Sequence, residues 1–488
     1  MVPGAERGTL PASPHPVYIT GIEIMVANVY ASQCTTGRNQ RGWVRVTKQS
    51  ETFRGTSGRK LNRRDFLKMG GAGLAGAALL GSTACGGGSS GSGNLVFSMG
   101  TDTSGTLQSL IDKFNKQSKD FKVTYQEMPT DSGAYFDKLR TQFQAGGGNI
   151  DVIGADVIWP AQFAANGWIL DVTDKFPKSE QSQFLPGPIQ SLMYDGKIYG
   201  VPWFTDAGML YYRADLLEKS GFAEPPATWA ELEEMGMKVA KDQGIDNAFV
   251  FQGDQYEGGV CNGLEYIWTH GGNVLDPANP DKVVIDSPEA IDGLTTEQNI
   301  VKKGVAPQSV ATFTETETDP AFLGNKAVFA RNWPYMYALA GTKDYPDVKP
   351  DQIGVSPLPV APGNGLASAL GGWNMLINAQ SDMQDEAWEF VQWMTSEQAQ
   401  RQRALDASLM PTRPALYDDQ KIRDTLPVIV QGEEALKNAR ARPVSPYYSD
   451  MSLEMQEQFN SVVKGDTSPQ DAVSSLQQSL EQIIEAGS

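Results

Sequence analysis

Asp206 is the only charged residue between Tyr199 and Tyr212. A carboxylate in such a stretch needs a partner or a ligand, because burying it unpaired would shift its pKa or cost several kcal/mol. Asp156 ends a predicted buried strand over 150–156 and stands beside Trp159. Both acids could therefore accept hydrogen bonds from a polar ligand. A cap on a nearby turn or helix N-terminus is the alternative for each of them.

Several aromatic residues stand beside glycine or proline at the ends of predicted strands. They are Trp333, Tyr335, Trp373, Tyr447 and Tyr448. A single aromatic residue in such a place is by default a core residue. Several of them in loops, together with acids, are more typical of a site for a flat, partly apolar ligand.

Arg442 adds a cation to this set, and Gly371 and Gly372 precede Trp373. Sugars pack their C–H faces on aromatic rings, and their hydroxyls form charge-assisted hydrogen bonds worth roughly 1.5–3 kcal/mol each in a dry site. Paired glycines would let the backbone approach such a ligand closely. The constellation therefore predicts a carbohydrate site without a metal or another cofactor.

The elements around these residues alternate short apolar strands with amphipathic helices, which indicates an α/β fold. A strand over 95–99 runs into the polar loop 100–105, and open α/β sheets bind ligands at such strand ends. The stretch 202–217 reads as a strand end, a polar break, a strand over 209–213 and a helix start, and a second α/β unit follows it. We expect 209–213 to be the first crossing between two lobes.

The composition excludes some partners. The 488 residues carry a formal charge of −18, but residues 1–84 hold eleven Lys/Arg and four Asp/Glu, so residues 85–488 have a balance of −25. This balance argues against nucleic acid and against an anionic membrane surface as partners of the folded part. With Cys34, Cys85, Cys261 and two histidines in the whole chain, we expect no zinc site and no disulfide.

The N-terminal region reads as an export signal. Arg63 and Arg64 precede sixteen weakly hydrophobic residues, 69–84, which are too few to span a bilayer and indicate a twin-arginine signal. Residues 82–85 resemble a lipobox, which predicts a lipid on Cys85; the alternative is an incidental cysteine at an ordinary cleavage site. In this interpretation 62–85 is the signal, 86–93 is a flexible Gly/Ser tether, and 1–61 is an unassigned extension.

The folded part resembles the trehalose/maltose-binding proteins of ABC importers, over about residues 95–488 and in the same order and spacing. The segments that carry the resemblance are DVIW at 156–159, WFTDAG at 203–208, QYEG at 255–258, RNWPY at 331–335, LGGW at 370–373 and RPVSPYY at 442–448.

The resemblance implies a periplasmic-binding-protein-like fold, with two α/β lobes joined by hinge strands and a ligand cleft between them. We expect residues 94–207 and 374–405 in the N-terminal lobe, and residues 208–373 and 406–488 in the C-terminal lobe. The residues implied to contact sugar are Asp156, Asp206, Trp333, Tyr335, Gly371, Gly372, Trp373 and Arg442.

Three positions depart from the family pattern. An acid implied after the first strand aligns with Gly105, which leaves Asp102 and Ser104 as possible substitutes. An arginine implied in the loop near Thr130 falls at Tyr135, and an implied tyrosine is Phe204. We include Asp102, Thr130 and Phe204 among the candidate ligand residues. The expected ligand is a trehalose- or maltose-type α-glucoside, with a glucosylated polyol as the alternative.

The predicted function is that of a monomeric, lipid-anchored receptor that closes on a neutral oligosaccharide and delivers it to an ABC permease. The rival class is a secreted glycoside hydrolase, in which Asp156 and Asp206 would form the catalytic pair. Neither acid has a recognisable catalytic motif around it. The sequence therefore favours a binding protein over an enzyme.

Overall fold

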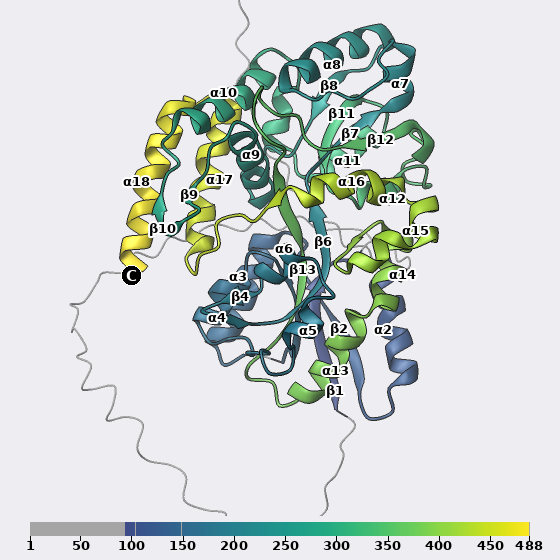
Figure 1. The fold of residues 1–488 in the computed structure, drawn as a ribbon, viewed down its shortest axis with the longest axis vertical. Helices are drawn as coiled ribbons and strands as arrows, with labels where there is room; N and C mark the ends of the chain where they lie inside the picture. Colours follow the sequence, from purple (N-terminus) through teal and green to yellow (C-terminus); the bar gives the residue numbers. More distant parts are fainter. Residues whose placement is uncertain (1–92, 103, 148, 488) are drawn as a thin grey trace, which may run out of the picture. The chain divides into compact units, whose positions relative to one another are not determined.

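The computed structural model describes residues 93–102, 104–147 and 149–487, and Figure 1 shows their fold. The expected extension, the export signal, Cys85 and residues 86–92 of the tether lie outside the described residues. Among the residues described, no helix has the length and apolar character needed to cross a membrane. Within the same part of the chain, no group of three His, Cys, Asp or Glu side chains could hold a metal ion.

The first lobe is built on a seven-stranded sheet of order β14-β6-β13-β3-β1-β2, with β15 paired to β13. The strands are β1 (Asn94–Gly100), β2 (Lys122–Met128), β3 (Val152–Asp156), β6 (Val201–Ala207), β13 (Ser368–Ile377), β14 (Met410–Pro411) and β15 (Ala439–Arg440). β1 runs parallel to β2 and β3, whereas β13 runs antiparallel to β3 and β6. Every residue of β3 and β6 is buried, as expected for strands covered on both faces.

Helices cover this sheet because their apolar residues recur every three or four positions. In α2, Leu107, Leu110, Ile111 and Phe114 form one buried stripe. The helices and the short hairpin of this lobe are α2 (Thr106–Gln117), α3 (Ser132–Gln144), α4 (Pro160–Ala165), α5 (Lys178–Gln181), α6 (Pro186–Gln190), β4 (Met193–Tyr194), β5 (Lys197–Ile198), α13 (Gln384–Met394) and α14 (Glu397–Ala407).

The second lobe is built on a four-stranded sheet of order β12-β7-β11-β8. Its strands are β7 (Met209–Arg213), β8 (Asn247–Val250), β11 (Ala327–Asn332) and β12 (Ile353–Ser356). A separate hairpin pairs β9 (Leu275–Asp276) with β10 (Asn279–Val283).

In the second lobe and the C-terminal segment, α9 and α10 pack with α17 and α18 (Figure 1). The α-helices here are α7 (Ala214–Lys219), α8 (Trp229–Gln243), α9 (Glu257–Thr269), α10 (Pro288–Lys302), α11 (Glu315–Leu323), α12 (Met336–Leu339), α15 (Gln420–Thr425), α16 (Pro427–Lys437), α17 (Tyr448–Lys464) and α18 (Pro469–Gly487). The 3-10 helices are η1 (Gln308–Thr312), η2 (Pro350–Gln352) and η3 (Pro414–Asp418).

The chain passes from one sheet to the other at Gly208, between β6 and β7. The expected lobe boundary between residues 373 and 374 falls inside β13, which pairs with β6 and β3 along most of its length. The expected boundary between residues 405 and 406 falls inside α14. Beyond it, β14 pairs with β6, so the first sheet takes a strand from a segment that the sequence placed with the other lobe.

Several local expectations are confirmed. The turn between β4 and β5 places Asp195 and Gly196 at positive φ, as a tight hairpin requires. Thr228 and Glu231 form the predicted capping box of α8. Cys261 is a buried residue of α9, and burial raises the pKa of its thiol to about 12.

Candidate functional site

The strand register brings five of the predicted residues together. Asp206 of β6 lies opposite Gly371 of β13, and Trp373 lies opposite both Phe204 of β6 and Asp156 of β3. A Cβ placed on Gly371 would lie 3.1 Å from the Asp206 Cβ, so these two positions share a face of the sheet. Residues that are far apart in the chain thus meet because β13 pairs with both neighbours in this register.

Trp333 follows β11 of the second lobe and reaches the same face. A Cβ on Gly371 would lie 2.9 Å from Cζ3 of the Trp333 ring, so a side chain at position 371 would displace the ring. The Arg331 guanidinium lies over the indole, 3.9 Å from the ring centre, and the indole N–H donates to Glu315 Oε1 at 3.0 Å. Arg331 and Glu315 therefore hold the Trp333 ring against the first lobe's strands.

The Tyr335 hydroxyl is committed to the protein. It donates to Asp319 Oδ2 at 2.9 Å, and Asn332 Nδ2 donates to the other carboxylate oxygen at 2.8 Å. Burial raises the pKa of Asp319 to about 7 despite the hydrogen bond from Tyr335. The part of Tyr335 left for a ligand is its half-buried ring.

Arg442 joins the two lobes. Its Nη2 donates to Asp156 Oδ1 at 3.0 Å, and its Nη1 donates to Glu257 Oε1 at 2.6 Å. Asp156 ends β3 of the first lobe and also accepts from Ser132 Oγ at 3.1 Å, whereas Glu257 begins α9 of the second lobe and accepts from the Tyr448 hydroxyl at 2.6 Å. One buried guanidinium thus bridges a carboxylate of the first lobe's sheet and a carboxylate of helix α9 in the second lobe.

Asp156 forms the backbone contact that its capping interpretation expects. Besides its ion pair with Arg442, Asp156 Oδ1 accepts from the Ile158 N–H at 3.3 Å, as the capping interpretation expects. Glu257 is a site residue that our sequence reasoning did not select, although it belongs to the QYEG segment of the resemblance.

Asp206 has no protein partner for one of its oxygens. The residue is 9% exposed, and its Oδ1 is buried without a hydrogen-bond partner among the described residues. Burial raises the pKa of Asp206 to about 7, against the opposing field of Arg403. Among the described residues, Asp206 forms none of the hydrogen bonds that the capping interpretation expects. Its Oδ1 therefore remains available to accept a hydrogen bond from a ligand.

Arg403 of α14 is the second residue that sequence reasoning missed. It is 5% exposed, and its guanidinium lies 3.9 Å from the centre of the Trp203 ring and 4.7 Å from that of Phe204. A signal was present in the sequence: Arg403 continues the buried helical stripe that Ala399, Gln400, Ala404 and Ala407 form. The polar composition of α14 concealed it.

The loops after β1 and β2 contribute fewer free polar groups to the site than the strands do. The Asp102 carboxylate accepts from the Leu107 N–H at 2.7 Å and from Ser104 Oγ at 2.6 Å, so it caps the start of α2. Gly105 has φ of 69°, a conformation that disfavours the acid implied there. Thr130 lies in the loop between β2 and α3 and is exposed. The structure thus assigns Asp102 a structural partner and Thr130 no hydrogen bond within the described residues.

Tyr135 belongs to the core rather than to a polar rim. It is fully buried, its hydroxyl lies 3.0 Å from Ser98 Oγ, and its ring stacks on Trp373 at 6.1 Å and 18°. Trp373 also meets Trp159 edge to face at 5.5 Å. Trp373 is therefore a half-buried ring that the first lobe holds on two sides.

Gly372 has a structural reason of its own. Its φ is 114°, and a Cβ there would lie 2.5 Å from the Phe204 carbonyl oxygen. The sequence expectation was that both glycines admit a ligand. In the structure, Gly372 admits the backbone of β6 and Gly371 admits the Trp333 ring.

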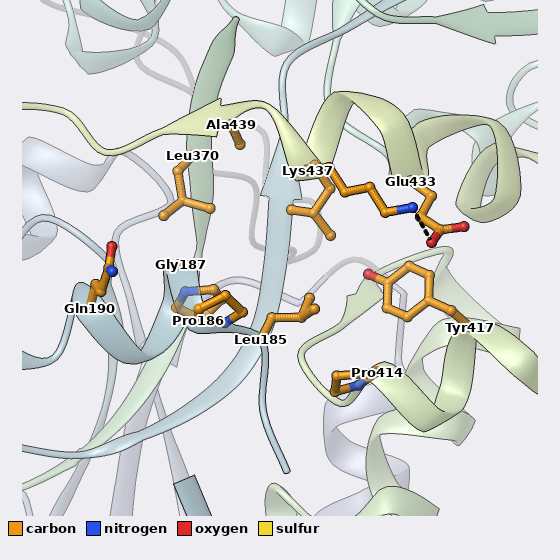
Figure 2. Close-up of a pocket in the computed structure, with 12 residues that line it drawn as sticks. Leu185, Pro186, Gly187, Gln190, Leu370, Pro414, Tyr417, Glu433, Lys437 and Ala439 are labelled. Carbon is orange, nitrogen blue, oxygen red and sulfur yellow. Dashed lines mark ion pairs between the residues drawn. The ribbon is translucent and has the colours of Figure 1, made fainter. Parts of the chain in front are cut away.

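A cavity of about 480 Å³ lies elsewhere (Figure 2). Leu370 lines it, and because successive strand residues point to opposite faces, this cavity lies behind Gly371 and Asp206. The Lys437–Glu433 ion pair of 2.8 Å closes one side. Its lining residues are Leu185, Pro186, Gly187, Pro188, Gln190, Leu370, Pro414, Tyr417, Glu433, Leu436, Lys437 and Ala439. None of the predicted ligand residues belongs to this lining.

A smaller cavity of about 140 Å³ lies between α3 and α4 of the first lobe and α17 of the second. It touches the Arg442 bridge through Glu257 and Tyr448, and it includes Ile158 and Trp159 from the DVIW segment.

Comparison with known proteins identifies the family. Residues 100–401, more than half of the chain, match bacterial extracellular solute-binding proteins. The chain belongs to this family. This solute-binding protein is 34% identical over 365 residues to a probable ABC transporter-binding protein of Deinococcus radiodurans, a match that covers 73% of this chain and 85% of that protein.

Solved structures agree in fold. The maltose-bound MalE3 of T. maritima is 38% identical, with a TM-score of 0.75, and the match covers 80% of this chain and 99% of that one. The GacH receptor of Streptomyces glaucescens is 24% identical, with a TM-score of 0.72 and coverage of 81% and 99%, and shows the shared fold. The predicted two-lobed α/β fold is thereby confirmed.

These matches establish the general role of this solute-binding protein. It is an extracellular solute-binding protein, similar to a probable ABC transporter-binding protein and to a maltose-bound protein of known structure. Its homologues and its fold are those of binding proteins rather than of enzymes.

Proposed function

We propose that this solute-binding protein captures a neutral α-glucoside disaccharide of the maltose or trehalose type. The observation that carries the proposal is the buried, unpartnered Oδ1 of Asp206 beside Gly371 and the Trp333 ring. An ionised carboxylate accepts hydrogen bonds from hydroxyls, and an indole face packs on the C–H face of a pyranose. The maltose-bound relative of T. maritima supports this ligand class.

In this proposal the aromatic rings come from both lobes. Trp333 and Tyr335 follow β11 of the second lobe, whereas Trp373 stands on β13 beside Phe204 and Asp156. A ligand between them would be held by rings of both lobes, and Arg442 would join the polar rim through its bridge from Asp156 to Glu257. Lobe closure is favoured by the additional contacts that the ligand makes in the closed state.

A glucosylated polyol is the second candidate. Phe204 provides no hydroxyl where the family pattern implies a tyrosine, and Asp102 is occupied as a cap. Both observations reduce the polar contacts available to a second sugar ring. A polyol in place of that ring would need fewer hydrogen bonds from this side of the site.

The test is calorimetry of the purified chain with maltose, trehalose, glucosylglycerol and mannitol. We expect micromolar or tighter binding of a disaccharide and none of mannitol. Tight binding of glucosylglycerol with weak binding of both disaccharides would shift the proposal to the second candidate. Turnover of a chromogenic α-glucoside at a useful rate would contradict a receptor function altogether.

We further propose that the protein is exported by a twin-arginine signal and held at the membrane as a lipoprotein through Cys85. The motif at residues 62–85 supports this proposal. Expression of Cys85→Ser and unaltered protein in a bacterial host, followed by detergent phase partitioning, tests it. We expect the unaltered protein in the detergent phase and Cys85→Ser in the aqueous phase, and the same partitioning of both would contradict the anchor.

A further inference from the structure

Arg403 is a buried cation without a polar partner. The residue is 5% exposed, and neither a hydrogen bond nor an ion pair joins its guanidinium to any described residue. Its Nε and Nη1 are both buried and unsatisfied. A buried N–H group without an acceptor is costly, and a buried charge without a partner is more so. The described residues offer these N–H groups no hydrogen-bond acceptor.

The contacts of Arg403 fix the plane of its guanidinium but satisfy none of its donors. Its Cζ lies 3.9 Å from the centre of the Trp203 ring and 4.7 Å from that of the Phe204 ring. Ring faces attract the cation and leave the N–H groups at its edge available. Both rings belong to β6, the strand that also carries Asp206. The guanidinium is thus held at a defined place beside this strand.

Asp206 is the matching acceptor. It stands two residues after Phe204, so the two side chains share a face of β6. Its Oδ1 is buried and unpartnered, yet no ion pair joins Asp206 to Arg403. The acid lies within the electrostatic influence of Arg403, and burial lowers the pKa of Arg403 to about 10 against the fields of Asp102 and Asp206. A fixed donor and a fixed acceptor are therefore held near one another without direct contact.

We propose that Arg403 is a specificity-determining ligand contact, which donates to one hydroxyl oxygen of the sugar while Asp206 accepts from a neighbouring hydroxyl. A vicinal diol offers this combination, because each hydroxyl both donates and accepts. The inference rests on the proposed function, and it names the feature that the site reads: two adjacent hydroxyls of a neutral sugar. Phe204 then has a role as the platform under Arg403.

The test couples a protein change to a ligand change. Maltose and its monodeoxy analogues are titrated by calorimetry into the unaltered protein and into Arg403→Met. We expect Arg403→Met to bind maltose on the order of 10- to 100-fold more weakly, the loss of one or two charge-assisted hydrogen bonds. One monodeoxy analogue should bind the unaltered protein at least tenfold more weakly than maltose does, and bind Arg403→Met as well as maltose does.

The matched control is Arg413→Met. Arg413 also stacks on an aromatic ring, at 4.2 Å from the centre of the Phe184 ring, but it donates to the Thr395 carbonyl and to Gln183. We expect this variant to bind maltose and all analogues as the unaltered protein does. Additive effects of Arg403→Met and every deoxygenation would overturn a direct contact.

Stability separates a ligand contact from a structural role. If Arg403 serves the ligand, the ligand-free Arg403→Met protein should melt at the same temperature as the unaltered protein or higher, because an unpaired buried charge is removed. A lower Tm with unchanged affinity would overturn the inference. If the unaltered protein binds no sugar or polyol of the panel, the proposed function fails, and a lowered ligand-free Tm of Arg403→Met would then overturn the inference separately.

Discussion

The pKa of the Asp206 carboxyl lies near neutral pH. Burial holds the pKa of Asp206 at about 7, opposed by Arg403 on α14 and Arg331 on β11 and reinforced by Asp156 on β3. A ligand hydroxyl donates more strongly to the carboxylate than to the neutral acid. Binding should therefore favour the ionised form and release a proton at or below neutral pH.

Maltose affinity should consequently fall as the pH is lowered through 7. If only the carboxylate form binds, the association constant drops roughly tenfold between pH 8 and pH 6. Calorimetry across this range checks the slope, and Asp206→Asn should bind weakly with no such pH dependence. An affinity that is flat from pH 8 to pH 6 in the unaltered protein would contradict a direct contact of Asp206.

The same carboxyl should lower stability at neutral pH. Its pKa in the folded protein lies above its ordinary value of 3.8, so between about pH 4 and pH 7 the unfolded chain ionises while the folded chain stays protonated. Stability is therefore lost as the pH rises through this window. Ligand-free Asp206→Asn should melt higher than the unaltered protein at pH 8 and at the same temperature near pH 4, as measured by calorimetric scans. A lower Tm of the variant at pH 8 would favour a structural role.

The crossing between the two sheets rests on a buried ion pair. Arg331 of β11 donates to Glu265 of α9 through Nε at 2.8 Å and Nη2 at 2.6 Å, and Glu265 Oε1 also accepts from the Ala369 N–H of β13 at 2.9 Å. Gly208 lies directly against this pair. A Cβ on Gly208 would lie 1.9 Å from Glu265 Oε1 and 2.6 Å from Arg331 Nη2.

Gly208→Ala should therefore be disruptive. The methyl group can fit only if the doubly bonded Glu265 moves, and overpacking of this kind costs about 1–3 kcal/mol, with more expected where a buried ion pair must break. Urea unfolding checks the loss of stability. Gly365→Ala is the control, because a Cβ at that exposed position would meet no atom within 4 Å. Equal unfolding midpoints for the two variants would contradict this account of the crossing.

Long elements with a clear period could be predicted from sequence, and short ones could not. The strand β6 begins with an apolar run, and the helix α8 has a helical apolar period and a capping box, which are local signals. The two-residue strands β14 and β15 exist only because β6 and β13 offer them an edge, so no local pattern marks them. The expected boundary near residue 405 accordingly falls inside α14 and before β14, a strand that no local pattern marks.

The site divides in a similar way. Asp156 and Asp206 stand out as acids in apolar surroundings, so sequence reasoning found them, and the strand register then placed them near Gly371 and Trp373. Arg403 did not stand out, because an arginine in a polar helix such as α14 is ordinarily solvated. Its burial depends on the packing of α14 beside β6, which is a tertiary fact.

At the scale of the whole molecule, Arg442 ties one lobe to the other through Asp156 and Glu257. Removing one member of such a buried network leaves the remaining charges uncompensated, at a cost of about 3–5 kcal/mol. In this case the two carboxylates would also repel each other across the lobes.

Arg442→Met should therefore weaken both lobe association and sugar binding. We expect a larger radius of gyration in small-angle X-ray scattering and maltose binding weaker by at least tenfold. Arg440→Met provides the control, because Arg440 lies nearby on β15 with an exposed side chain. A radius of gyration that matches that of the control would contradict the role of the bridge.

The position of β13 in the first sheet has a consequence for biosynthesis. β13 lies between β6 and β3, although it is made some 160 residues after β6. Until residue 377 has left the ribosome, β6 and the β3-β1-β2 group have no strand to join them, so the N-terminal half of the chain cannot complete a lobe on its own. In many proteins the first domain folds while the next is translated, but the first lobe of this protein cannot fold in that order. The folding of the first lobe must wait until residue 377 of the 488 has been made, and any machinery that handles the chain meets a long incomplete polypeptide first.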